Sequence, residues 1–260
     1  MTDPLPAGSP APGGGGARVA RAPAVEVRAL EVRYGEILAL RGASLTVERG
    51  RVCGLVGMNG AGKTSLLRTI LGLTRPGAGS VLVDGAPPSA GRRAGAIAYV
   101  PQSEDVDWDF PLSVREVVAT GRYARQGLLR RPRPADRAAV AEALERVGLA
   151  ELAQRQIGAL SGGQRKRAFV ARAIAQEASL LLLDEPFAGV DTGTQEDLSS
   201  LLRELAAAGA TVVVSTHDLD AVPALCDEVA LVAGTVLDHG EPARILEPAS
   251  LARAFGRSAA

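Results

Sequence analysis

The sequence predicts an α/β fold, with a doubly wound and mainly parallel sheet, an antiparallel β-region packed beside it and a helical block inserted in its middle. Three observations predict this fold. A glycine-rich loop lies between an apolar run and a helix-like segment, strand-like and helix-like patterns alternate around that loop, and residues 113–177 are helical in pattern. Strands that alternate with helices typically form a parallel sheet covered on both faces.

The composition allows a sizeable core in one domain, or in one domain plus a subdomain. The chain has 260 residues, 47% of them hydrophobic, and its 29 basic residues balance 29 acidic ones. This balance gives no reason to expect nucleic acid or an anionic membrane surface as the main partner. Cys53 and Cys226 are expected to be reduced, mostly buried thiols, and not a disulfide or a metal-binding pair. No apolar run reaches the ~20 residues of a membrane-spanning helix, so any membrane role is expected to come through a partner.

The chain begins with a low-complexity segment. Residues 1–23 are rich in proline and glycine, and we expect them to form a disordered tail. Alternating apolar residues then predict two strands of the antiparallel β-region, over residues 25–34 and 43–47. The single domain is expected to span residues 24–247, and residues 248–260 to form a short C-terminal tail.

The glycine-rich loop, residues 57–64, fits G-x-x-x-x-G-K-[ST], the phosphate-binding P-loop. Its glycines let backbone N–H groups turn toward an anion, and the following helix adds the positive end of its dipole. Lys63 can reach the β- and γ-phosphates, and the Thr64 hydroxyl can ligate Mg²⁺. The alternative is a glycine-rich turn with a chance Lys-Thr pair. The candidate phosphate-binding residues are Gly57, Asn59, Gly60, Ala61, Gly62, Lys63, Thr64 and Ser65.

The inserted helical block spans about residues 103–176 and follows a predicted strand at 97–100. Helices are expected at 114–119, 136–147 and 163–177, and Asp136 is expected to be the N-cap of the second. Within this block, residues 160–164 read Leu-Ser-Gly-Gly-Gln. A serine and two glycines at a helix start expose a hydroxyl and backbone N–H groups, so this string predicts a second anion-binding surface. The P-loop and this second surface could bind one γ-phosphate together only across a head-to-tail dimer.

An acidic pair ends the next predicted strand. Four leucines precede Asp184 and Glu185, and open α/β sheets place their ligand chemistry at such carboxyl ends. Asp184 is expected to complete the Mg²⁺ shell that Thr64 begins, and Glu185 to polarise a water for attack on the γ-phosphate. The alternative is a solvated acidic pair that caps a helix.

The two histidines receive different predictions. His217 follows a β-branched strand at 211–215, and beside a nucleotide site we expect it to contact the γ-phosphate rather than serve only the fold. Residues 228–232 and 235–237 are expected to close the sheet as a strand pair. His239 lies on this predicted edge strand, near Gly240, and is assigned no chemistry.

Together these motifs resemble the ATP-binding subunit of ABC transporters, from Val25 to about Leu246. The resemblance implies that ATP and Mg²⁺ are the cofactors, that Gln102 senses Mg²⁺ and the attacking water, and that Asp191 couples the two sites of a dimer. It also implies that Tyr34 stacks on the adenine base. The residues expected to contact the partner's nucleotide are Ser161, Gly162, Gly163 and Gln164.

The segment after Gln102 resembles the importers for manganese, zinc or iron within this family. The resemblance implies a separate membrane permease, an extracytoplasmic substrate-binding protein and a peripheral position on the cytoplasmic face of the membrane. Trp108 and Phe110 are candidate anchors for the permease, with burial in the helical block as the alternative.

Other functions stay open at this point. The cargo could be a siderophore, haem or a non-metal solute. A soluble ABC ATPase that works on DNA or ribosomes is disfavoured, because such proteins usually carry two nucleotide domains or a long coiled-coil insert. A P-loop kinase or a weakly hydrolysing regulator is disfavoured by residues 160–164 and by Glu185.

Overall fold

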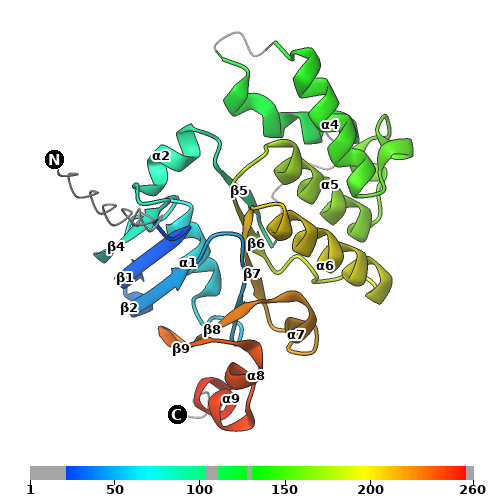
Figure 1. Ribbon diagram of the computed structural model, residues 1–260. Coiled ribbons are helices and arrows are strands. Elements are labelled where there is room, and N and C mark those ends of the chain that lie inside the picture. The colour runs from blue at the N-terminus through cyan, green and yellow to red at the C-terminus, as the bar shows by residue number, and fades with distance from the viewer. Residues whose placement is uncertain (1–21, 103–110, 128–130, 256–260) are drawn as a thin grey trace, which may run out of the picture.

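The computed structural model describes residues 22–102, 111–127 and 131–255 (Figure 1). Within these residues the strands form two sheets, a three-stranded sheet of order β2-β1-β4 and a six-stranded sheet of order β5-β6-β7-β3-β8-β9. The strands are β1 (Val25–Tyr34), β2 (Ile37–Val47), β3 (Val52–Val56), β4 (Ala78–Val83), β5 (Ile97–Val100), β6 (Leu180–Asp184), β7 (Thr211–Thr216), β8 (Glu228–Val232) and β9 (Val236–Gly240).

The six-stranded sheet is parallel except for β9, which pairs antiparallel with β8. Every residue of β3, β6 and β7 is buried, because parallel strands covered on both faces bury both sets of side chains. Alternate residues of β3 enter two different apolar clusters. Val52 and Val56 belong to the cluster that contains the helical block, and Cys53 and Leu55 to the one shared with β1, β2 and α1.

The three-stranded sheet is antiparallel throughout. The second strand starts at Ile37, six residues before the predicted start at residue 43, so that prediction was too short. Register shifts between β1 and β2 flank Leu30, where Ala29 and Gly42 both have positive φ, 46° and 60°. Such bulges interrupt the alternation of apolar residues on which the prediction depended.

Helices cover both faces of the large sheet, and α3, α4 and α5 pack together between β5 and β6 in chain order (Figure 1). The α-helices are α1 (Lys63–Ile70), α2 (Pro88–Arg93), α3 (Val114–Ala119), α4 (Pro134–Arg146), α5 (Gly162–Ala175), α6 (Thr192–Ala207), α7 (Val222–Leu225), α8 (Pro242–Ile245) and α9 (Pro248–Phe255). Short 3₁₀ helices occur at η1 (Thr120–Arg125), η2 (Ala150–Leu152) and η3 (Ile157–Ala159). The predicted fold class is confirmed. No helix in the described ranges combines the length and apolarity that crossing a membrane demands.

The predicted N-cap of α4 was wrong. The helix begins at Pro134, so Asp136 occupies the third helical position instead of the cap. Proline suits the first turn because its missing N–H would have no partner there. The buried Asp136 carboxylate accepts hydrogen bonds from the Arg133 backbone N–H at 2.8 Å and from the Arg122 guanidinium at 2.9 Å. It therefore ties the start of α4 to η1.

Candidate active site

The P-loop connects β3 to α1, and two of its glycines are fixed by close approach of the backbone. A side chain on Gly57 would place its Cβ 2.2 Å from the Val232 carbonyl oxygen. Gly62, the residue before α1, has φ +100°, and its Cβ would lie 2.6 Å from Leu40 Cδ2. The backbone of the loop therefore packs closely against β8 on one side and against β2 on the other.

The loop lines a cavity of about 220 Å³. Gln102 and Glu185 join it from the ends of β5 and β6, together with Ala39 from β2. The P-loop residues that line the cavity are Met58, Asn59, Gly60, Ala61, Gly62, Lys63, Thr64 and Ser65. All the P-loop candidates except Gly57 therefore reach one cavity, at the carboxyl ends of the strands.

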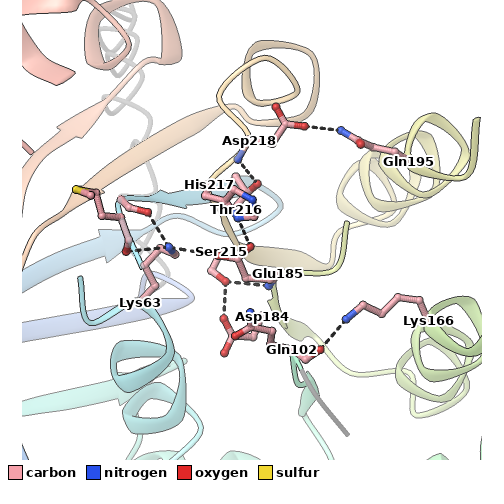
Figure 2. A network of polar contacts seen from close by, with 12 residues as sticks. Lys63, Gln102, Lys166, Asp184, Glu185, Gln195, Ser215, Thr216, His217 and Asp218 are labelled. Atoms are coloured by element: carbon pink, nitrogen blue, oxygen red, sulfur yellow. Dashed lines mark hydrogen bonds and ion pairs between the residues drawn. The ribbon is translucent and has the colours of Figure 1, made fainter. Parts of the chain in front are cut away.

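Lys63 is 5% exposed and lies at the centre of this loop. Its ammonium donates to the carbonyls of Gly57 at 2.7 Å and Met58 at 3.2 Å, and lies 3.3 Å from Glu185 Oε1 (Figure 2). The first turn of α1 holds no acidic residue that would compete with a bound anion for the helix N-terminus. Lys63 and the N-terminus of α1 therefore concentrate positive charge where phosphates are expected.

Glu185 is held in an uncommon backbone conformation directly after β6. Its φ is +50°, which costs a non-glycine residue of order 1–3 kcal/mol. The Glu185 N–H donates to the Ser215 side chain at 2.9 Å and to the Ser215 carbonyl at 3.2 Å, which holds this turn against β7. The carboxylate is 5% exposed. It lies between Lys63 and His217, whose Nδ1 is 2.5 Å from Glu185 Oε2 (Figure 2).

Asp184 is 1% exposed, and one of its two carboxylate oxygens accepts a hydrogen bond. Its Oδ1 accepts a hydrogen bond from the Ser215 hydroxyl at 2.5 Å, whereas the buried Oδ2 has no hydrogen-bond partner among the described residues. Burial, followed by the negative charge of Asp184, raises the pKa of Tyr99 to about 12. A buried carboxylate oxygen without a donor is costly unless a cation or a water satisfies it. The residues present at this position therefore fit a cation such as Mg²⁺.

Gln102 lies at the end of β5, where its side chain is exposed to the cavity. Its backbone carbonyl accepts a hydrogen bond from the Lys166 ammonium on α5 at 2.9 Å (Figure 2). This bond links the helical block to the rim of the cavity.

The second predicted anion surface forms the exposed N-terminus of α5. Ser161 caps the helix in a reciprocal arrangement with Gln164, at 3.3 Å and 3.0 Å. Among the described residues, the lining of the P-loop cavity includes no part of residues 160–164. Within one chain, the two predicted anion-binding surfaces therefore do not share that cavity.

Asp191 lies beside this surface as the N-cap of α6. Its carboxylate accepts from the Thr194 N–H at 2.9 Å and the Thr194 hydroxyl at 2.8 Å. These two bonds, the backbone one first, lower the pKa of Asp191. A Cβ on Gly163 would lie 3.7 Å from Val190 and 3.8 Å from Thr194, so the start of α5 adjoins the Asp191 cap.

Of the three aromatic candidates, only Tyr34 lies within the described residues. Tyr34 ends β1 with 44% of its surface exposed, and its hydroxyl lies 3.3 Å from that of Thr74. It does not line the P-loop cavity within the described chain. Trp108 and Phe110 lie outside the described residues.

Sequence reasoning missed Ser215, a fully buried residue of β7. Its hydroxyl bonds both Asp184 and Glu185 at the end of the neighbouring strand β6. It also missed Lys166, which reaches Gln102. The signal for Ser215 was a hydroxyl two residues before His217 at the end of an otherwise valine-rich strand. Its partners depend on strand order, which the local pattern does not give.

Comparison with known proteins agrees with this geometry. A family model described as ABC transporter matches residues 30–188. The chain is 47% identical to the chelated iron transport system membrane protein YfeB of Yersinia pestis, over 84% of this chain and 74% of that protein. It is 44% identical to the manganese transport system ATP-binding protein MntA of Synechocystis, over 89% and 90%. It is 40% identical to the zinc transport system ATP-binding protein TroB of Treponema pallidum, over 91% and 88%.

Solved structures lead to the same family. A metal-chelate type ABC transporter in an inward-facing conformation superposes with a TM-score of 0.79 at 32% identity, over 90% of this chain and 89% of that chain. The cbiO1 subunit of the cbiONQ transporter complex from Clostridium perfringens has a TM-score of 0.74 at 31% identity, over 89% and 94%. The chain belongs to the ABC transporter family, as one of its ATP-binding, ATP-hydrolysing subunits.

Proposed function

We propose that this chain powers the import of a divalent metal ion, manganese, zinc or iron, through a separate membrane permease, by hydrolysing MgATP between two copies of itself. The observation that carries the proposal is the placement of Glu185. Its buried carboxylate lies at the rim of the P-loop cavity, between Lys63 and His217. A carboxylate at this position can accept a proton from a water that attacks the γ-phosphate.

Side chains in the cavity, together with His217 and Asp184 beside it, each take one part of this chemistry. Lys63 leaves Glu185 to bind the β- and γ-phosphates, which frees the carboxylate to act as a base. His217 holds the carboxylate and contacts the γ-phosphate. Thr64, Gln102 and Asp184 hold Mg²⁺, and the unpartnered Oδ2 of Asp184 supports this assignment. When bound there, the cation would neutralise charge on the phosphate oxygens.

The second half of each site comes from a partner copy. Ser161, Gly162, Gly163 and Gln164 form an exposed helix start away from their own P-loop. In a head-to-tail dimer these residues bind the γ-phosphate held by the other copy, and Asp191 beside Gly163 couples the two sites. Tyr34, exposed at the end of β1, stacks on the adenine base.

The cargo assignment follows from the relatives. Those reported above are named for transport of manganese, zinc or chelated iron. The alternative is a chelated cargo such as a siderophore or haem, which the metal-chelate type transporter favours. The chain works at the cytoplasmic face of the membrane, where the region of Trp108 and Phe110 docks the permease. An extracytoplasmic protein delivers the cargo.

Reconstitution tests the cargo directly. The full chain and its permease are placed in vesicles, and ATP turnover is measured while the binding protein delivers manganese, zinc, iron or a ferric siderophore. Stimulation by a free divalent metal supports the proposal, and stimulation by the siderophore alone replaces it with the chelated cargo. Trp108→Ala should lower co-purification with the permease. An unchanged yield of complex with unchanged coupled turnover would exclude docking through this residue.

A further inference from the structure

Three metal-ligating side chains meet on the large sheet, apart from the nucleotide cavity. Cys53 of β3 pairs in register with Glu228 of β8, and His239 of β9 pairs with Ala230, two residues along β8. Residues paired in register, or two apart on a strand, share one face of a sheet. The Cys53 thiol, a Glu228 carboxylate oxygen and a His239 ring nitrogen lie within 4.8 Å of one another.

Two polar atoms of this cluster are buried without a hydrogen-bond partner among the described residues, Glu228 Oε1 and His239 Nε2. The nearest approach between the two side chains is 3.3 Å, from Nε2 to the other carboxylate oxygen. Buried polar atoms of this kind call for a ligand or an ordered water. The side chains of His239 and Glu228 are still 26% and 18% exposed, so the cluster lies close to the surface although its polar atoms are buried.

We propose that Cys53, Glu228 and His239 bind a divalent transition-metal cation of the Zn²⁺ class. One thiolate, one imidazole and one carboxylate form a mixed sulfur, nitrogen and oxygen set, and a water would fill the fourth tetrahedral position. Thiolate and imidazole favour zinc-like ions over Mg²⁺ or Ca²⁺. In a tetrahedral site the ligand atoms lie roughly 3.5 Å apart. The His239 and Glu228 ligand atoms are already that close, at 3.3 Å, and no pair in the cluster is farther apart than 4.8 Å, so binding needs a closing movement of about 1 Å at most.

Binding is an exchange of a proton for a cation. Burial, followed by the negative charge of Glu228, raises the pKa of the Cys53 thiol well above its ordinary value. The free protein therefore keeps that thiol protonated. When the cation binds, the S–H bond breaks, the sulfur keeps the electron pair and bonds to the metal, and the proton leaves to water. Nothing is oxidised or reduced.

Hydrogen bonds of the β8–β9 turn connect the site to the nucleotide cavity. The Gly234 N–H donates to the Ala61 carbonyl of the P-loop at 2.8 Å, and the Gly234 carbonyl accepts from the Arg41 N–H at 2.7 Å. Cys53 itself lies four residues before Gly57 on β3. A cation that joins β3, β8 and β9 thus fixes the hairpin that supports the P-loop. This inference does not depend on the identity of the transported cargo.

The test uses the full chain, freed of metal with a chelator and kept without nucleotide. It is titrated with Zn²⁺ against a competing chelator, and separately with Co²⁺ as an optical probe. We expect one Zn²⁺ per chain, a higher Tm with Zn²⁺ than without, and a thiolate-to-cobalt charge-transfer band. Cys53→Ser should remove the band, and both Cys53→Ser and His239→Gln should weaken Zn²⁺ binding by ~10-fold or more.

Two control variants locate the ion. Cys226→Ser removes the other cysteine, which packs against Gly54 on the opposite face of β3, and Asp184→Asn removes the proposed Mg²⁺ ligand. Both should bind Zn²⁺ as the wild type does. If either abolishes binding, or if His239→Gln and Cys53→Ser bind normally, the assignment is wrong. The absence of stoichiometric binding in the wild type would overturn it as well. Because His239 is partly exposed, its variant stays informative even if Cys53→Ser fails to fold.

Discussion

Replacing Ser215 with alanine tests whether this serine holds the two acidic residues of the cavity in place. The fully buried hydroxyl donates to Asp184 Oδ1 at 2.5 Å and accepts from the Glu185 N–H at 2.9 Å. The first bond reaches a carboxylate and should contribute about 1.5–3 kcal/mol, and the second about 0.5–1.5 kcal/mol. Ser215→Ala should therefore lower the free energy of unfolding by about 2–4 kcal/mol.

The substitution should also slow ATP hydrolysis. Without the hydroxyl, the Glu185 N–H keeps only its longer bond to the Ser215 carbonyl, at 3.2 Å. A small displacement of the base should reduce turnover roughly tenfold or more. Urea unfolding followed by circular dichroism gives the stability, and a coupled assay with the permease complex gives the turnover. The control is Ser200→Ala, an exposed serine of α6, expected to stay within about 0.5 kcal/mol. A Ser215→Ala protein as stable and active as that control would refute the reasoning.

The structure predicts the outcomes of three further substitutions. Gly57→Ala should abolish ATP binding measured by calorimetry, because its Cβ would lie 2.2 Å from a backbone oxygen; normal affinity would contradict the close approach. Lys63→Ala should also lose ATP binding, and retained affinity would remove the loop as the phosphate anchor. Asp136→Asn should lower Tm near neutral pH. The Arg133 N–H first, then Arg122, lower the pKa of Asp136, so its stabilisation is present above the ordinary carboxyl pKa and is lost as pH falls through the folded value. The Tm difference between wild type and variant should therefore vanish in acid, and a difference that persists there would contradict this.

The parts of the site that the sequence predicts are those carried by short contiguous strings. Residues 57–64 follow the buried strand β3, and Asp184 and Glu185 stand at the end of the buried strand β6. The sheet brings them to one edge because parallel strands end there together. His217 reaches Glu185 for the same reason. Local pattern, apolar periodicity and the topology of parallel sheets together suffice for these residues.

The remaining features depend on which strands become neighbours. Ser215 meets Asp184 because β6 pairs with β7, and Cys53 meets His239 because β8 lies between their strands. Such pairings join residues far apart in the chain, and no periodicity within a short window encodes them. His239 for this reason received no role from the sequence. The division into domains, the stacking role of Tyr34 and docking through Trp108 and Phe110 stay predictions.

The central claim is that Glu185 is the catalytic base of a site that closes only between two copies of the chain. The most direct measurement is the turnover and oligomeric state of Glu185→Gln in MgATP, by a phosphate-release assay and light scattering. The amide keeps the shape of the side chain but cannot take a proton from water. The account predicts a fall in turnover of at least ~100-fold and a stable, ATP-bound dimer. Normal hydrolysis, or a variant that stays monomeric with ATP bound, would contradict it.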